Sequence, residues 1–224
     1  MRYRLRVLAV GGAIALAIAS SAFVHADFVG LPSPTPETPG VALDPFTSGP
    51  AGTVLATLEI PFVDNAAPTP FATGTLYSLV VDRGGGLLDF YYQLANTSEP
   101  PSEDTKEFFR LKTTGGFDPG LVISVAQTDT LGNLVAGSSD FDENDYPTTE
   151  QAAATADRDV ATPGSIGFTF PTQPPLPFIG DSENVGQGQA SEFLIVRTNA
   201  TRYGLVQVAI SGAATSLASA LAPG

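Results

Sequence analysis

The sequence predicts an all-β protein with a β-sandwich or jelly-roll-like fold of about seven to nine strands. Three observations support this fold class. Apolar residues alternate with polar ones in short runs, Gly and Pro separate the runs, and almost no stretch has helical periodicity. No internal repeat is visible, and a chain of 224 residues is most simply one domain.

The clearest local prediction is a β-hairpin. Thr73 to Asp82 and Leu88 to Leu94 both alternate, and Asp82-Arg83-Gly84-Gly85-Gly86 between them is a turn sequence. The preceding run, Val54 to Phe62, also places apolar side chains at every second position. These runs therefore predict a half-buried strand followed by a hairpin.

The rest of the predicted domain, residues 53–212, contains shorter strands and two long loops. An acidic loop covers residues 137–164, where Thr149 to Ala156 is expected to form one or two helical turns. The second loop covers residues 171–189, and residues 213–224 are expected to form a small-residue tail. Further strands are expected at residues 108–112, 121–127, 134–136, 166–170, 191–198 and 203–211.

The N-terminus predicts export. Three arginines within the first six residues precede an uncharged apolar run from Val7 to Ile18, and small residues follow. This order is typical of a secretory signal peptide, residues 1–26, cleaved after Ala26 or alternatively after Ala22. The other interpretation is an uncleaved membrane anchor, since the apolar run is just long enough to span. Residues 27–52 contain six prolines and are expected to form an extended leader, loosely attached to the fold.

The charge of the chain excludes two classes of partner. The net charge is −13, and removal of residues 1–26 takes away three arginines and leaves −16. Such an acidic chain repels nucleic acid phosphates and anionic lipids, so neither is an expected partner. Leu205 to Ala222 carries no charge, but polar residues interrupt it too often for a membrane span.

The residue inventory argues against most catalytic mechanisms. The chain has no Cys, and its only His, His25, belongs to the predicted signal peptide. The mature protein therefore has no imidazole base and no thiol nucleophile. A carboxylate pair and a Ser-Lys arrangement stay open, but among 23 acidic residues a close pair is uninformative. We expect a protein that is not an enzyme, with an Asp/Glu-dependent glycoside hydrolase as the alternative.

The sharpest local motif is Asp140-Phe141-Asp142-Glu143-Asn144-Asp145. Asp140, Asp142 and Asn144 alternate, as oxygen ligands do at the start of a calcium loop. Asp145 stands where an EF-hand has its glycine, and Glu150 comes one position too early to close the loop. These residues predict either a calcium site, the one cofactor that the sequence suggests, or a solvated acidic loop.

Carbohydrate binding is a common role of secreted β-sandwiches, and it uses exposed aromatic rings. The chain has no Trp. Tyr91 points away from the face that Phe90 and Tyr92 share, which makes Tyr91 the candidate ligand residue. The alternative is that Tyr91 packs beneath a loop or the second sheet.

Several phrases of the sequence resemble a known class of exported proteins. These phrases are "LLDFYYQLANTS", "TADRDVATPGSIGFTF" and "GQGQASEFLIVRTNAT", with "APG" at the end. They resemble short bacterial extracellular proteins of the exosortase-sorted PEP-CTERM type over about residues 53–223. The resemblance implies an exported β-rich domain of the extracellular matrix and assigns no functional residue. In that class a Val-Pro-Glu-Pro sorting tail follows, whereas this chain ends at Gly224, so we expect free release.

Together these features predict a secreted, non-catalytic structural or interaction protein of the cell exterior or extracellular matrix. Its partner is expected to be an extracellular protein or polysaccharide. Two alternatives stay open: a calcium-assisted carbohydrate-binding module and a carboxylate-dependent hydrolase.

Overall fold

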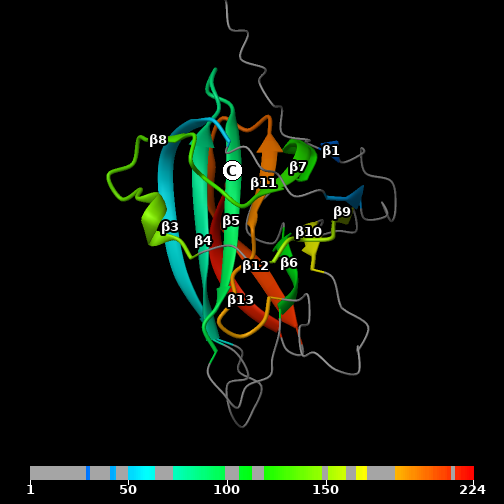
Figure 1. The fold of residues 1–224 in the computed structure, drawn as a ribbon. Helices are drawn as coiled ribbons and strands as arrows, with labels where there is room; N and C mark the ends of the chain where they lie inside the picture. Colours follow the sequence, from blue (N-terminus) through cyan, green and yellow to red (C-terminus); the bar gives the residue numbers. More distant parts are fainter. Residues whose placement is uncertain are drawn as a thin grey trace, which may run out of the picture.

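The computed structural model describes residues 29–30, 41–43, 50–63, 73–98, 106–112, 119–147, 151–159, 165–170, 185–212 and 215–224. Within these residues the fold is all-β, as predicted, and thirteen strands form two sheets (Figure 1). The helical elements of the described part are two short 3₁₀ turns, η2 (Pro119–Leu121) and η3 (Glu143–Asp145). The strand number exceeds the seven to nine expected, mainly because several strands have only two or three residues.

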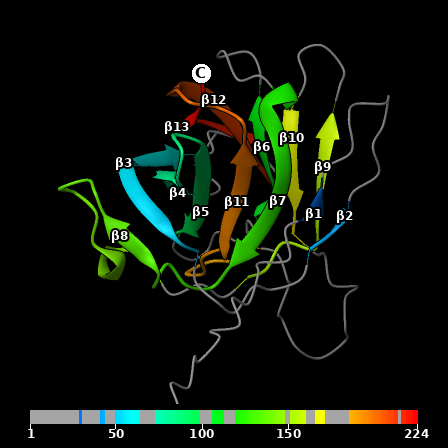
Figure 2. The ribbon, with the colours of Figure 1, turned by 90° about the horizontal axis from the view of Figure 1, so that it is seen from above.

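The first sheet has seven strands in the order β1-β7-β11-β5-β4-β3-β8. Neighbouring strands are antiparallel except β8, which runs parallel to the start of β3. Figure 2 shows the five long strands following one another in a curved layer. The strands are β1 (Val29–Gly30), β3 (Gly52–Val63), β4 (Thr73–Asp82), β5 (Leu88–Asn96), β7 (Val122–Thr128), β8 (Leu134–Ala136) and β11 (Phe193–Thr198).

The second sheet has six antiparallel strands in the order β13-β12-β6-β10-β9-β2. The chain crosses between the sheets several times, so strands that are far apart in sequence lie side by side. The strands are β2 (Val41–Ala42), β6 (Lys106–Lys112), β9 (Thr155–Asp159), β10 (Ser165–Thr169), β12 (Tyr203–Gly212) and β13 (Thr215–Pro223).

The predicted hairpin is confirmed as β4 and β5, which pair over nine positions. Its turn depends on glycine, because Gly84, Gly85 and Gly86 have φ angles of 110°, 71° and 75°. The Asp82 carboxylate accepts a hydrogen bond of 2.8 Å from the Gly84 amide and closes the turn.

A buried ion cluster holds this end of the hairpin to β11. Asp89 is buried between two partly exposed guanidinium groups, with Arg83 Nε and Arg197 Nη2 each 3.0 Å from its carboxylate. Arg83 also donates to the Thr198 carbonyl at 2.8 Å. Burial raises the pKa of Asp89, and the two arginines oppose that rise. Since an unpaired buried charge is costly, this cluster favours the observed pairing of β5 with β11.

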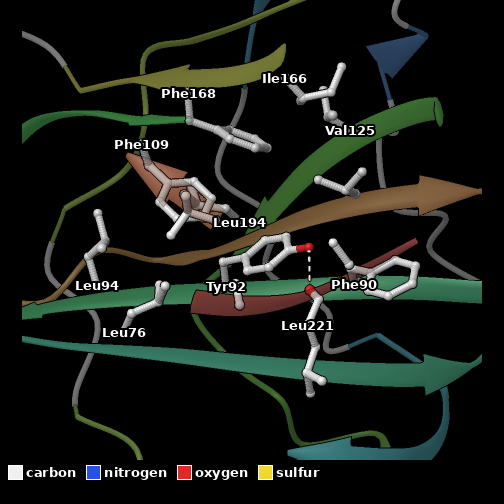
Figure 3. Close-up of a cluster of buried hydrophobic side chains, with 14 of the residues drawn as sticks. Leu76, Phe90, Tyr92, Leu94, Phe109, Val125, Ile166, Phe168, Leu194 and Leu221 are labelled. Carbon is white, nitrogen blue, oxygen red and sulfur yellow. Dashed lines mark hydrogen bonds between the residues drawn. The ribbon is translucent and has the colours of Figure 1, made fainter. Parts of the chain in front are cut away.

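The main hydrophobic core lies between the two sheets. Figure 3 shows Tyr92 of β5 beside Phe109 and Phe168 of the second sheet. The ring centroids of Tyr92 and Phe109 are 5.1 Å apart, and those of Phe109 and Phe168 are 6.4 Å apart. The Tyr92 hydroxyl donates a hydrogen bond of 2.8 Å to the Leu221 carbonyl of β13. This bond satisfies the polar end of a ring that is otherwise surrounded by apolar side chains.

The prediction of a tail at residues 213–224 is wrong for the described residues. Thr215–Pro223 forms β13, which pairs with β12 over nine positions. Its small residues Ser216, Ala218 and Ala220 face the interior and are buried. Such small side chains give little hydrophobic signal in a sequence, although they fit where the two sheets lie close together.

Two other expectations differ from the structure. Residues 151–156 are not helical: the Ala153 amide donates to the Gln127 side chain at 2.7 Å, and β9 begins at Thr155. Residues 149 and 150 lie outside the described residues. The leader, expected to be loosely attached, contributes β1 and β2 to the sheets and buries Leu43 in the core. In both places the hydrogen-bonding partner is distant in sequence, so local patterns do not reveal it.

Candidate functional site

Residues 129–147 cover the outer face of the seven-stranded sheet. This segment, called the acidic lobe below, contains five acidic residues and no basic one. Its apolar side chains pack on a second hydrophobic cluster, separate from the main core. Figure 1 shows β8 and the η3 turn of the lobe beside β3. The lobe side chains in this cluster are Leu131, Leu134, Phe141 and Tyr146, and the sheet contributes Val54, Leu79, Val81, Tyr91, Ala126, Phe193 and Ile195.

Tyr91 lies beneath this lobe. The prediction that Tyr91 presents its ring to a ligand is wrong, because the residue is only 1% exposed. Tyr91 does point away from the main core, as the alternation predicted, but it packs in the second cluster. Burial raises the pKa of its hydroxyl well above the ordinary value. The alternative interpretation, packing beneath a loop, is the one that the structure shows.

Backbone contacts fix the lobe against β3. β8 pairs with Gly52, Thr53 and Val54 at the start of β3. Gly137, the residue after β8, lies directly against the Val54 carbonyl oxygen. A side chain at position 137 would overlap this oxygen. The Leu134 amide also donates to the Leu131 carbonyl at 2.8 Å. The lobe is therefore attached at its centre as well as by its apolar side chains.

Tyr146 anchors the C-terminal end of the acidic lobe and lies in a group of aromatic rings. Its ring makes edge contacts with Tyr77 of β4 and Phe193 of β11, at centroid distances of 5.3 and 5.6 Å. Phe141, also in the lobe, lies 6.3 Å away. Burial raises the pKa of Tyr146 to about 12, with a further contribution from Asp145. Its hydroxyl is consequently a neutral hydrogen-bonding group at physiological pH.

Two hollows open on either side of Tyr146. The first has a volume of about 330 Å³ and the second about 270 Å³. Each combines aromatic or apolar walls with carboxylate, amide or hydroxyl groups. The first is lined by Asp129, Thr130, Leu131, Gly132, Glu143, Asn144, Tyr146, Pro147 and Phe193. The second is lined by Thr57, Leu58, Glu59, Tyr77, Asp140, Asp145 and Tyr146.

The second hollow is strongly negative. Burial raises the pKa of Tyr77, and the nearby Glu59 and Asp145 carboxylates add to this rise. The same two carboxylates act on Tyr146, so both phenols lie in one negative field. This hollow is suited to ligands that donate hydrogen bonds or carry positive charge.

Glu192, close to the first hollow, has an unusual protonation behaviour. β11 and β7 pair Phe193 with Thr128, so the next position on each chain sets Glu192 opposite Asp129. Burial raises the pKa of Glu192 to about 7, and the charge of Asp129 adds to this effect. Its Oε2 atom is shielded from solvent and has no hydrogen-bond donor among the described residues. A general acid must reach its substrate, so the shielded Oε2 atom itself could not serve as one.

The predicted calcium ligands are divided between the two hollows. Asp140 lines the second hollow and Asn144 the first. Asp142 caps the η3 turn: its Oδ1 accepts hydrogen bonds from the Asn144 backbone at 3.0 Å and its side-chain amide at 2.7 Å. These bonds lower the pKa of Asp142. Within the described part of the chain, no three His, Cys, Asp or Glu residues are grouped so that they could hold a metal ion. A site that also uses the Asn144 oxygen stays a prediction.

Sequence reasoning identified the acidic run but missed Tyr146 and Glu192. Tyr146 directly follows the run, and an aromatic residue at the end of a polar loop is a reasonable candidate for an anchor on the domain. No local signal identifies Glu192, because its environment depends on the pairing of β11 with β7.

Comparison with family models, curated proteins and solved structures finds no match to this chain. The part of the chain that the structure describes contains no helix whose length and hydropathy suit a membrane span.

Proposed function

We propose that this chain is an exported, non-catalytic interaction protein of the cell exterior that binds its partner through the acidic lobe. The N-terminal signal sequence supports export, and the resemblance to exosortase-sorted proteins supports an extracellular matrix. The missing Cys and mature His support a non-catalytic role. Two sheets around one core, with repeated crossings between them, support assignment to the β-sandwich, jelly-roll-like class.

The observation that carries this proposal is the position of Tyr146 between two hollows. Ligand sites commonly combine apolar walls with a few polar groups that orient the ligand. The first hollow offers the rings of Tyr146 and Phe193 together with the Asn144 amide. A polysaccharide fits this chemistry, because sugars present apolar ring faces and many hydroxyl groups. Calcium bound by Asp140, Asp142 and Asn144 would assist such binding from within the same lobe.

The test is binding to soluble polysaccharides and to a glycan array, with calcium and with a chelator. Replacing a polar lining residue, Asn144→Ala or Glu143→Gln, is expected to weaken binding about tenfold, as the loss of one hydrogen bond would. Asn199→Ala is the matched control, because Asn199 is also exposed but lies after β11, outside both hollows. If no glycan binds under either condition, the polysaccharide ligand is refuted.

Carboxylate-dependent hydrolysis is the second candidate, favoured only by the raised pKa of Glu192 beside Asp129. The same glycans serve as substrates, and release of reducing ends is measured. Turnover that Glu192→Gln abolishes would replace the non-catalytic proposal with this one.

A further inference from the structure

The second hollow beside Tyr146 is formed by two segments that are distant in sequence. Glu59 of β3 and Tyr77 of β4 are direct partners across the two strands, so both side chains lie on the outer face of the seven-stranded sheet. The acidic lobe supplies the other wall with Asp140, Asp145 and Tyr146. This hollow of about 270 Å³ therefore forms only when the lobe is folded onto β3 and β4.

Two tyrosine rings form a corner of this hollow. The ring centroids of Tyr77 and Tyr146 are 5.3 Å apart, and the ring planes are inclined at 67°. Phe193, which does not line this hollow, holds the Tyr146 ring by an edge contact at 5.6 Å. The face of an aromatic ring attracts a cation, and two steeply inclined rings can do so from two sides. The corner is therefore already shaped for an ammonium group in the free protein.

Three carboxylates surround this corner and have no basic partner among the described residues. Glu59, Asp140 and Asp145 line the hollow and are exposed. The arginines that form ion pairs in the described part of the chain use other carboxylates. Burial raises the pKa of both tyrosines, and the Glu59 and Asp145 carboxylates add to this rise, so their field reaches both rings. A positively charged ligand would balance a field that the protein leaves unbalanced.

The size and position of the hollow favour an amino sugar over a lysine side chain. Since a water molecule takes about 30 Å³ of liquid, a volume of about 270 Å³ is comparable with the roughly ten non-hydrogen atoms of one sugar unit. A lysine side chain has only about half as many atoms and would leave much of this space to water. Tyr146 lines both hollows, so neighbouring units of one polymer can enter both.

Given the proposed function, on which this inference rests, we propose that the second hollow binds an ammonium group and that the polysaccharide carries free amino groups. One sugar unit lies in the first hollow, and the protonated amino group of a neighbouring unit lies beside Tyr77, Tyr146 and Glu59. Charge-assisted hydrogen bonds to the carboxylates and contact with the ring faces both depend on the positive charge. Acetylation of the amino group removes this charge and weakens both interactions.

The test compares two ligands that differ only in acetylation, the hexamers of glucosamine and of N-acetylglucosamine. Calorimetric titration at about pH 5.5 gives both dissociation constants where amines are protonated and ordinary carboxylates are ionised. A chelator keeps calcium from competing for Asp140. The amino hexamer is expected to bind at least about tenfold more tightly, or by about 1.4 kcal/mol. About 0.5 M salt is expected to reduce this preference, because the carboxylates are exposed.

Equal binding of the two hexamers would overturn the ammonium site and leave the proposed function intact. The site is also tested without any sugar, by NMR titration with n-butylammonium chloride to about 50 mM, because such a contact gives at most millimolar affinity. The ring signals of Tyr77 and Tyr146 are expected to shift. Unshifted rings would overturn the ammonium site, whereas shifted rings without binding of any glycan would refute only the polysaccharide.

Variants separate the two hollows through the ratio of the two dissociation constants. Glu59→Gln and Asp145→Asn are expected to lower the preference for the amino hexamer at least about threefold each, and both side chains are exposed, so the fold is retained. Glu143→Gln is the matched control, since it removes an equal charge from an exposed position of the first hollow. It is expected to weaken both hexamers and leave the ratio unchanged.

Two results would overturn the assignment. An equal fall of the ratio with Glu143→Gln would mean that net charge, and not the second hollow, selects the ligand. Binding of hexalysine as tight as that of the amino hexamer, and sensitive to Glu59→Gln, would assign the hollow to a basic protein instead of a polysaccharide.

Discussion

Replacing Glu192 with Gln is expected to stabilise the protein at alkaline pH and not at acidic pH. The pKa of Glu192 rises from an ordinary 4.5 to about 7 in the fold. Below pH 4.5 the carboxyl is protonated in both the folded and the unfolded chain, so its burial as a charge does not lower the free energy of unfolding. As the pH rises toward 7 the unfolded chain loses this proton first, and stability falls until the folded carboxyl also ionises.

The expected magnitude follows from this difference in pKa. A rise from 4.5 to about 7 corresponds to about 3.4 kcal/mol. We halve this to about 1.7 kcal/mol, because the side chain is only half-buried and water screens its charge. For a chain of this size the change amounts to about 3 to 7 °C in the melting temperature.

Thermal melts of wild type and Glu192→Gln at pH 4.5 and pH 8 measure the effect. Glu143→Gln is the control, since it removes an equal charge from an exposed position, in the acidic lobe. Asp129→Asn is expected to produce part of the gain, because Asp129 contributes to the raised pKa. An equal change in melting temperature at both pH values, or a lower melting temperature of Glu192→Gln at pH 8, would contradict the raised pKa of Glu192.

Three further changes test the fold. Asp89→Ala is expected to lower the free energy of unfolding, measured in urea, by about 3 kcal/mol. This value is at the lower end of the range for breaking a buried ion pair, because both arginines keep contact with water. Asp157→Ala, in a more exposed pair, should cost about 1 kcal/mol or less, and equal losses would contradict this ranking. Tyr92→Phe leaves the Leu221 carbonyl unpaired and is expected to cost about 1–3 kcal/mol; an unchanged urea midpoint would show that this bond contributes nothing. Gly137→Ala is expected to detach β8 from β3, which would be measured as faster amide hydrogen exchange in the acidic lobe with little change in the hairpin. Unchanged exchange in the lobe would argue against the close contact of Gly137 with the Val54 carbonyl.

Part of the candidate site could be anticipated and part could not. The acidic run from Asp140 to Asp145 is visible in the sequence, and it does form a surface turn. For Tyr91 the sequence leaves two positions open, a ligand-binding face and a site beneath a loop, and local patterns do not decide between them because β5 is covered on both faces. Alternation shows that Tyr91 and Tyr92 point in opposite directions, but it does not say which of the two directions leads to solvent.

Local patterns in the sequence are sufficient to predict the all-β class, the turn at Gly84 to Gly86 and the alternation of the long strands. These depend on backbone preferences and on residues that are close in sequence. Three other features become visible only in the folded chain: residues 215–223 form a strand, the acidic lobe covers the second face of the sheet, and Glu192 faces Asp129. Each of these three features depends on contacts between segments that are distant in sequence, and the packing of the two sheets on one core sets which segments meet.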